Sequence, residues 1–160
     1  MKAPESLSGV IMDILRDKLG DRASQYALPP PVFVAMDGEF LELDMDAGFL
    51  TAEFPVRQRY MNPYGTMQGG MVAAAFDNTL GPLSMLVAPP NVTRRLEVTY
   101  SRPVTLGVGY IVVKARLVER KERRLFLKAD LSGREGPRLA RAKALHWIVD
   151  QQEAEERDAV

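Results

Sequence analysis

The sequence contains no cysteine, and its 160 residues include a single histidine, His146. Without cysteine the chain forms no disulfide, offers no thiolate to a metal and has no cysteine nucleophile. One histidine also excludes any metal site that is built from several histidines. These two scarcities remove several large classes of metalloprotein and redox protein before any motif is considered.

An excess of charge of either sign is missing too. Lys+Arg and Asp+Glu each number 21, so the formal net charge is zero. Broad electrostatic binding to nucleic acid or to an anionic membrane needs a basic excess, and we expect neither partner. The N-terminus carries no apolar signal core, and Asp77 interrupts the most apolar stretch, residues 69–90. We therefore expect a cytoplasmic protein without a membrane span.

Three segments are predicted along the chain. Apolar residues at helical spacing predict a helix over residues 6–19, which Gly20 ends. Prolines at 29–31 predict a stiff extended linker, because proline fixes φ and forbids helix. We divide the chain into an N-terminal helix and linker (1–31), one domain (32–150) and an acidic tail without apolar pattern (151–160).

The central part of the chain reads as strands around one helix. Leu41, Leu43 and Met45 alternate with acidic residues, and a second alternating run follows a turn, which predicts a hairpin. The alanine-rich run after Gly70 predicts an apolar helix that Gly81-Pro82 kinks or ends. Four more alternating runs follow over 92–100, 111–117, 125–131 and 140–148. An apolar helix is best buried by a sheet curled around it, which predicts an α+β domain.

Asp77 is the residue that does not fit an apolar helix. An unpaired buried carboxylate costs several kcal/mol, on the order of the stability lost when a buried ion pair is broken. Three interpretations stay open: a wet stripe on the helix, a functional carboxylate, or a buried structural hydrogen bond. The preceding Gly69-Gly70 pair adds weight to function, since free N–H groups at a helix start attract a negative oxygen. Asp77 lies about 12 Å further along the helix, so one site needs a second subunit packed antiparallel.

The spacing of these residues carries a resemblance. Asn62 stands six residues before Gln68-Gly69-Gly70, and Asp77 follows in the next helix. Together with the strand end at 98–103, this pattern resembles the hotdog-fold acyl-CoA thioesterases, in particular the PaaI-like branch named for phenylacetic acid degradation. The resemblance implies an antiparallel sheet wrapped around one central helix, with the N-terminal helix as an addition.

The resemblance also implies roles. The Gly69 N–H would polarise the thioester carbonyl, Asn62 and Gln68 would position the carbonyl or the water, and Asp77 of a neighbouring subunit would act as base or nucleophile. Relatives place a hydroxyl residue on the following strand; spacing puts Arg95 nearest that position, with Thr93 two residues earlier. The further substrate-binding candidates, including contacts to CoA phosphates, are Gly70, Arg94 and Arg102.

One position departs from the family pattern, because Gln68 stands where the family has histidine. Glutamine keeps hydrogen-bonding groups but does not titrate near neutral pH. His146 is expected to be a satisfied sheet histidine. We therefore expect an acyl-CoA thioesterase, a homodimer or a dimer of dimers, with no cofactor beyond the CoA of its substrate. The alternative is a non-catalytic acyl-CoA-binding module; a hotdog dehydratase is disfavoured because it needs the missing histidine.

Overall fold

The structure is a computed structural model that describes residues 5–150, so the predicted acidic tail lies outside the described residues. Its helices are α1 (Leu7–Leu19), α2 (Pro31–Ala35) and α3 (Gly69–Val87). Its strands are β1 (Glu39–Asp44), β2 (Phe49–Pro55), β3 (Asn91–Tyr100), β4 (Tyr110–Lys121), β5 (Arg124–Gly133) and β6 (Arg138–Ile148). Short 3-10 turns cover Gly20–Gln25, Gln58–Tyr60 and Leu106–Val108.

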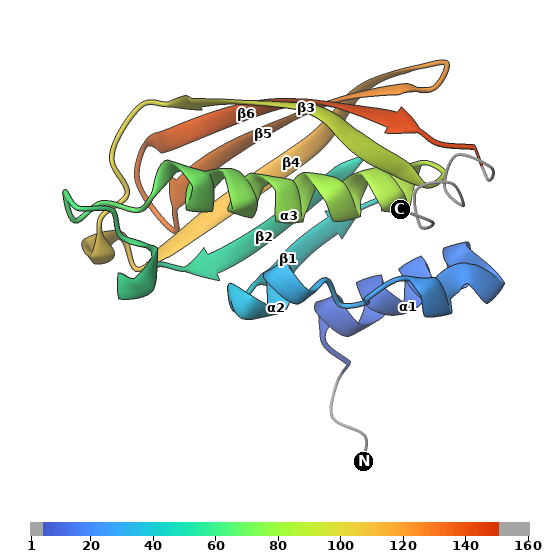
Figure 1. Ribbon diagram of the computed structural model, residues 1–160, viewed down its shortest axis with the longest axis horizontal. Helices are drawn as coiled ribbons and strands as arrows, with labels where there is room; N and C mark the ends of the chain where they lie inside the picture. The colour runs from blue at the N-terminus through green and yellow to red at the C-terminus, as the bar shows by residue number, and fades with distance from the viewer. Residues whose placement is uncertain (1–4, 151–160) are drawn as a thin grey trace.

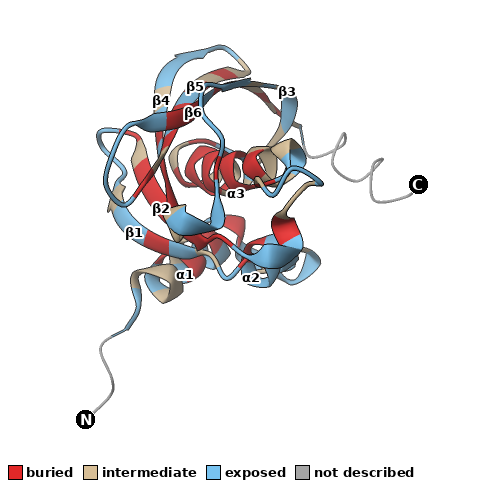
Figure 2. Ribbon diagram, turned by 90° about the vertical axis from the view of Figure 1, so that its left-hand side faces the viewer, coloured by how far each residue is buried: buried red, intermediate tan, exposed pale blue. Residues whose placement is uncertain are grey.

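The strands form one antiparallel six-stranded sheet in the order β1-β2-β4-β5-β6-β3. After α3 the chain crosses to the far edge, so β3 pairs with β6 and leaves β2 beside β4. The sheet curves around α3, and α1 and α2 lie together below it (Figures 1 and 2). The predicted α+β class and the hotdog architecture are confirmed. Among the described helices, none combines the length and the apolar character that crossing a membrane requires.

The central helix follows the curved sheet with its apolar side inward. Phe76, Leu80 and Leu83 are completely buried, whereas Asp77 on the opposite side is exposed. The sequence predicted that Gly81-Pro82 kinks or ends this helix, and an end there was wrong. Proline removes one backbone donor, but Pro82 is itself buried in the core. Packing supplies most of the stability of a helix in a protein, so the helix continues to Val87.

The β1–β2 hairpin is confirmed, but its inner face differs from the predicted one. Phe40 is buried, whereas Leu41 is 45% exposed and Met45 is 40% exposed. The register shifts between Phe40 and Glu42. An extra residue at a bulge exchanges the two faces of a strand, so simple alternation failed here. The predicted runs over 111–117, 125–131 and 140–148 keep their alternation, and in β6 the side chains at 140, 142, 144, 146 and 148 all point inward and are buried.

The N-terminal segment packs on the same core. Ser6 caps α1 by accepting a hydrogen bond from the Gly9 N–H at 3.1 Å, and Gly20 ends the helix with φ of +56°. The predicted extended linker was wrong from Pro31 onward, because this proline begins α2 at the position where a helix tolerates proline best. α1 contributes buried side chains on one face. The domain boundary at residue 31 stays a prediction.

One lysine ties α1 to the end of α3. The Lys18 ammonium donates to the carbonyls of Met85, Leu86 and Ala88 at 2.7, 2.8 and 3.1 Å. These carbonyls lie at the C-terminus of α3, where the helix dipole favours a cation. Burial lowers the pKa of Lys18, so part of this gain is offset by desolvation.

We predict that Lys18→Met lowers the free energy of unfolding by about 1–2 kcal/mol, because it keeps the alkyl stem and removes the charged donor. The measurement is chemical denaturation at pH 7. The neighbouring Asp17→Asn is the matched control, since Asp17 is exposed on the same helix. Equal free energies of unfolding for the two variants would contradict a stabilising contact between Lys18 and the end of α3.

Candidate active site

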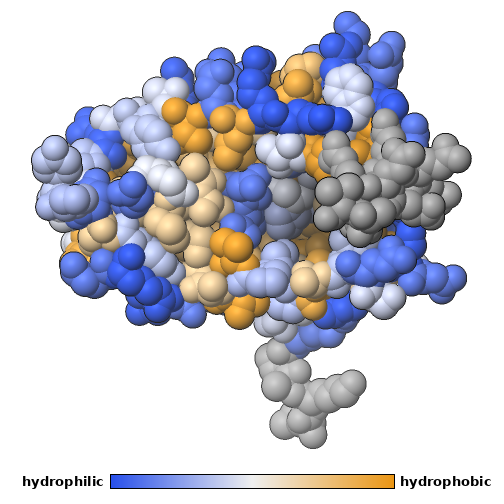
Figure 3. Space-filling model, viewed as in Figure 1, coloured by the Kyte–Doolittle hydropathy of each residue, from blue (hydrophilic) through white to orange (hydrophobic). Residues whose placement is uncertain are grey.

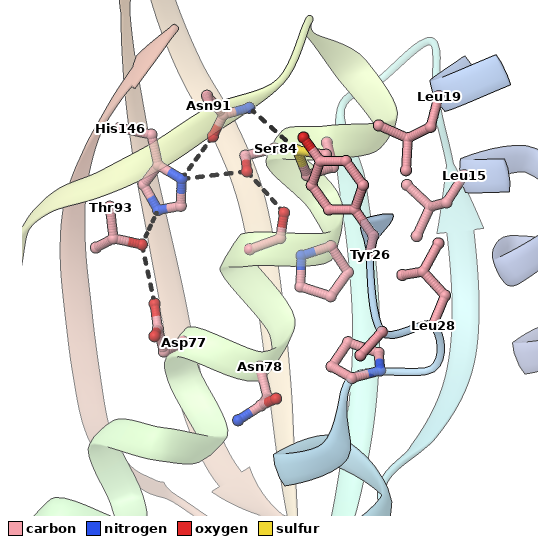
Figure 4. A pocket seen from close by; sticks show the side chains of 15 residues that line it. Leu15, Leu19, Tyr26, Leu28, Asp77, Asn78, Ser84, Asn91, Thr93 and His146 are labelled. Atoms are coloured by element: carbon pink, nitrogen blue, oxygen red, sulfur yellow. Dashed lines mark hydrogen bonds between the residues drawn. The ribbon is translucent and has the colours of Figure 1, made fainter. Parts of the chain in front are cut away.

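A pocket of about 330 Å³ lies between α3, the end of the sheet and the N-terminal segment. One wall is polar and comes from α3, β3 and β6; the other is apolar and comes from α1 and the segment after it (Figure 4). The polar wall holds Asp77, Asn78, Ser84, Asn91, Thr93 and His146. The apolar wall includes Leu15, Leu19, Tyr26 and Leu28. The pocket therefore presents a carboxylate to a largely apolar space.

Asp77 is exposed in the single chain, which agrees with a wet stripe on α3 rather than with full burial. Its Oδ1 atom accepts a hydrogen bond from the Thr93 hydroxyl at 3.2 Å. Thr93 comes from the edge strand β3, so the edge of the sheet fixes the carboxylate of the helix. A carboxylate held by one hydrogen bond at the mouth of a pocket keeps oxygen lone pairs for a water molecule or a substrate.

Behind Thr93 stands His146, which is 1% exposed. The His146 Nε2 atom lies 3.3 Å from the Thr93 hydroxyl, and Nδ1 lies 3.1 Å from Ser84 Oγ and 2.9 Å from Asn91 Oδ1. Burial lowers the pKa of His146, and the negative charge of Asp77 opposes this effect. The buried imidazole is thus neutral near pH 7 and is connected to Asp77 through one hydroxyl.

A second pocket, of about 400 Å³, adjoins the start of α3. Asn62, Gly69 and Arg102 line it, which brings three predicted site residues together. Gln68 is the residue before α3, and its exposed side chain makes no capping hydrogen bond. Within residues 5–150, the N–H groups of Gly69 and Gly70 find no protein acceptor. The helix start therefore presents free donors, as expected for a site that stabilises a negative oxygen.

Two neighbours shape this helix start. The Tyr100 hydroxyl donates to the Gly69 carbonyl at 2.7 Å, and burial raises the pKa of Tyr100. The Asn62 side chain accepts from the Tyr64 and Thr66 N–H groups and donates to the Thr66 hydroxyl. Asn62 thus holds the loop that leads to Gln68. The predicted role of Asn62 in positioning the carbonyl or the water stays a prediction.

The two halves of the predicted site do not meet within one chain. Asp77 and Thr93 line the first pocket, and Gly69 lines the second. Gly69 and Asp77 are eight residues apart on one continuous helix, which places them about 12 Å apart along its axis. The sequence anticipated this separation.

Arg95 does not lie beside Asp77; Thr93 takes that place. The pairing of β3 with β6 shifts after Thr93, so that Thr93 faces His146 and Arg95 faces Leu145. The intervening Arg94 is the extra residue of a bulge. Arg95 lines a depression that Lys128 and Lys143 also line, away from Asp77. The arginines 94, 95 and 102 are exposed and form no ion pair among the described residues.

His146 is the satisfied sheet histidine that the sequence predicted, but its place beside Thr93 and Asp77 was not foreseen. The signal was present, because His146 is the only polar residue at an inward position of an otherwise apolar strand face. The sequence does not show that Thr93 pairs with His146, because this pairing depends on the bulge at Arg94. Within residues 5–150, no cluster of three or more His, Asp or Glu side chains is placed to hold a metal ion.

Comparison with known proteins agrees with the fold. Residues 64–140 match the thioesterase superfamily. No curated protein matches the chain. A crystal structure of a phenylacetic acid degradation-related protein from Ralstonia eutropha JMP134 has a TM-score of 0.72 at 25% identity, over 84% of this chain and 98% of the other.

Two further structures share the fold at lower identity. The E. coli PaaI protein of the phenylacetic acid degradation operon has a TM-score of 0.67 at 13% identity, over 72% of this chain and 86% of its own. A hypothetical thioesterase from Streptococcus pneumoniae TIGR4, solved with coenzyme A, has a TM-score of 0.65 at 18% identity, over 71% and 87%. The resemblance to PaaI-like hotdog thioesterases is confirmed.

The buried histidine predicts how stability depends on pH. The unfolded chain binds a proton at His146 below its ordinary pKa of about 6.5, whereas the folded chain does not until lower pH. We expect the free energy of unfolding to fall as the pH drops below that value, by at most about 1.4 kcal/mol per pH unit. Denaturation at pH 7.5 and pH 5.5 measures this loss. His146→Gln should lose less stability over the same interval, and an equal loss would contradict the assignment to His146.

Proposed function

We propose that the protein hydrolyses an acyl-CoA thioester to a free acid and CoA. The observation that carries this proposal is the Asp77 carboxylate, held by Thr93 at the mouth of a largely apolar pocket. An apolar pocket with a few convergent polar groups is the usual form of a small-molecule site. The superfamily match to residues 64–140 supports the reaction class.

Asp77 is proposed to act as base or as nucleophile on the thioester. As base, it takes a proton from water while the water oxygen bonds to the carbonyl carbon. As nucleophile, it forms an acyl intermediate that water then hydrolyses. In both cases the C–S bond breaks and the thiolate of CoA leaves with a proton. The acyl group would lie in the pocket between α3 and the N-terminal segment, and CoA is part of the substrate rather than a separate cofactor.

A second copy of the chain is proposed to complete the site. The exposed side of α3 carries small and apolar residues, and apolar side chains gather in the middle of that face of the molecule (Figure 3). These half-buried residues are Met71, Ala73 and Ala74. An antiparallel α3 packed there would bring its free Gly69 and Gly70 N–H groups to Asp77, where they would stabilise the oxyanion of the transition state. A homodimer or a dimer of dimers would satisfy this requirement.

The remaining predicted residues have proposed roles around this centre. The exposed side chain of Gln68 would hydrogen-bond the thioester carbonyl or the attacking water, with Asn62 holding its loop. The exposed guanidinium groups of Arg94, Arg95 and Arg102 would bind CoA phosphates, as arginine forks do. The expected cytoplasmic location stays a prediction.

A non-catalytic acyl-CoA-binding module is the second candidate. The observation that favours it is Gln68, which cannot exchange protons at the position where the family has histidine. CoA release from a panel of aryl- and alkyl-acyl-CoAs, read with a thiol reagent, separates the two candidates. Turnover supports the hydrolase, whereas saturable binding without turnover supports the module. The absence of cysteine keeps the protein itself silent in this assay.

We predict that Asp77→Asn lowers kcat by at least about 10², because the amide cannot accept the proton of water.

The Gly69→Pro variant tests the oxyanion donor. Proline is tolerated at the first helical position, and it removes the Gly69 N–H. We expect a loss of about 10²–10³ in kcat. Gly69→Ala is the matched control, since it adds a Cβ near the exposed Tyr100 ring but keeps the N–H.

Combining the two inactive variants in one dimer tests whether each site is shared between two chains. A heterodimer of Asp77→Asn with Gly69→Pro contains one site with both wild-type residues and one site with neither. Co-expression of the two differently tagged chains and purification through both tags should therefore restore about half of the wild-type kcat per dimer, by simple site counting. Heterodimers as inactive as their parents would place both residues in one chain's site and contradict the shared arrangement.

Gly81 tests the acyl pocket. It lies on α3 at the pocket wall, and a Cβ added there meets no atom within 4 Å. Gly81→Leu should fill part of the pocket and raise KM most for the bulkiest acyl groups, while the helix itself gains stability. Gly81→Ala, which adds one methyl group, is the control and should change the acyl preference little. The same preference in all three proteins would remove this pocket from substrate binding.

A further inference from the structure

The contacts of His146 define which ring nitrogen carries its proton. The Asn91 amide group donates to the Pro89 carbonyl at 2.9 Å, so the Asn91 oxygen faces His146. The Ser84 hydroxyl donates to the Gly81 carbonyl at 2.6 Å, so a lone pair of Ser84 also faces His146. Both neighbours of Nδ1 are acceptors, and Nδ1 must therefore be the donor. In the neutral ring, Nε2 then carries no hydrogen and is an acceptor.

The Thr93 hydroxyl stands between two acceptors. On one side lies His146 Nε2 at 3.3 Å, and on the other lies the Asp77 carboxylate at 3.2 Å. Thr93 has one proton, so with a neutral imidazole and an ionised Asp77 only one of the two contacts is a hydrogen bond. One added proton satisfies both contacts, either on Asp77 or on His146 Nε2. The arrangement thus has room for one proton at either end.

We propose that Thr93 and His146 form a proton relay that stores the proton which Asp77 removes from water during thioester hydrolysis. This proposal rests on the proposed function and adds His146, which the family pattern described above does not contain. His146 acts through Thr93 and does not touch the substrate, so it is a positioning residue for the base. The relay supplies a titratable histidine to a site whose loop carries Gln68 in its place.

The proposed step conserves protons at each stage. The water oxygen bonds to the carbonyl carbon, and its proton passes to Asp77. Asp77 passes a proton to the Thr93 oxygen as the Thr93 proton moves to His146 Nε2. The resulting imidazolium keeps Asn91 and Ser84 as acceptors at Nδ1, and Asp77 is again ionised. When the C–S bond breaks, the proton returns along the same path and leaves on the sulfur of CoA.

The groups around His146 suit an imidazole that binds a proton and releases it again. Asp77 from α3 is the charged group that faces it through Thr93, and its charge stabilises the imidazolium. From β3 the neutral Asn91 and Thr93 face the ring, and from β5 the apolar Leu125 pairs with it. Across the pocket the N-terminal segment offers the neutral phenol of Tyr26. Burial lowers the pKa of His146, so the stored proton is readily given back.

The first test measures the imidazole itself and needs no activity. Because His146 is the only histidine, untagged protein labelled with ¹⁵N-histidine gives one pair of ring signals. We expect the Nδ1-protonated tautomer at neutral pH and a titration midpoint that falls further in Asp77→Asn, which removes the opposing charge. The Nε2-protonated tautomer, or a midpoint that is unchanged in Asp77→Asn, would overturn the relay.

The second test measures turnover of the best acyl-CoA substrate. His146→Gln keeps hydrogen-bonding groups but cannot titrate, and we expect kcat to fall about 10-fold or more with KM nearly unchanged. The wild-type kcat should fall on the acid side as His146 becomes protonated, and this limb should be absent in the variant. The solvent deuterium isotope effect should also be smaller in the variant, because fewer protons move.

Thr93 variants separate the relay from a merely structural role. Thr93→Val should lose as much kcat as His146→Gln, the double variant should lose no more, and Thr93→Ser should restore activity. Thr79→Val is the matched control, since its buried hydroxyl donates to the Ala75 carbonyl and makes no hydrogen bond to Asp77, Thr93 or His146. If His146→Gln and Thr93→Val keep the wild-type kcat and acid limb while Asp77→Ala is inactive, the relay fails and the hydrolase stands. If Asp77→Ala is fully active, the role of Asp77 and the relay both fail, whereas a wild-type protein that releases no CoA overturns the proposed function.

Discussion

The structure depends on the burial of one side of α3 in a curved antiparallel sheet. Phe76, Leu80 and Leu83 point into the sheet and are fully buried, so α3 cannot rotate without exposing them. Asp77 is thereby fixed on the opposite side, toward β3 and the N-terminal segment. The same constraint fixes the direction of the free N–H groups at the helix start. A packing requirement between apolar surfaces therefore sets the geometry of the polar chemistry.

The polar groups around His146 enter this core together with their partners, whereas the Thr51 hydroxyl on β2 is buried without one. His146 is buried on the inner face of β6, and three side chains from α3 and β3 surround its two ring nitrogens. An unsatisfied buried polar group costs about 1–3 kcal/mol, so such a cluster persists because its members satisfy one another. Within this cluster, the single proton of Thr93 serves two acceptors. The missing hydrogen bond is therefore at the Thr93 hydroxyl, which connects the buried imidazole to the exposed Asp77 carboxylate.

The sequence predicted the parts of this site that depend on local spacing, and the sequence could not predict the parts that depend on register. Period-two alternation located the strands, and the position of Asp77 in an apolar helix was readable directly. The alternation did not show the bulge at Arg94, which turns Thr93 rather than Arg95 toward Asp77. Nor does any local pattern show that the N-terminal segment forms the far wall of the pocket. Both depend on contacts between segments distant in the chain.

The position of His146 on the sheet behind Asp77 offers a physical explanation for Gln68 at the place where the family has a loop histidine. Hydrolysis of a thioester moves a proton from water to the departing sulfur. Without a second group, the carboxylate itself must hold this proton beside the oxyanion until the sulfur leaves. In this chain the titratable ring lies on the core side, one hydroxyl behind the carboxylate. Under the proposed relay, Gln68 is free to hydrogen-bond the substrate without titrating. The burial that lowers the pKa of His146 then keeps the ring neutral, so that it can accept the proton.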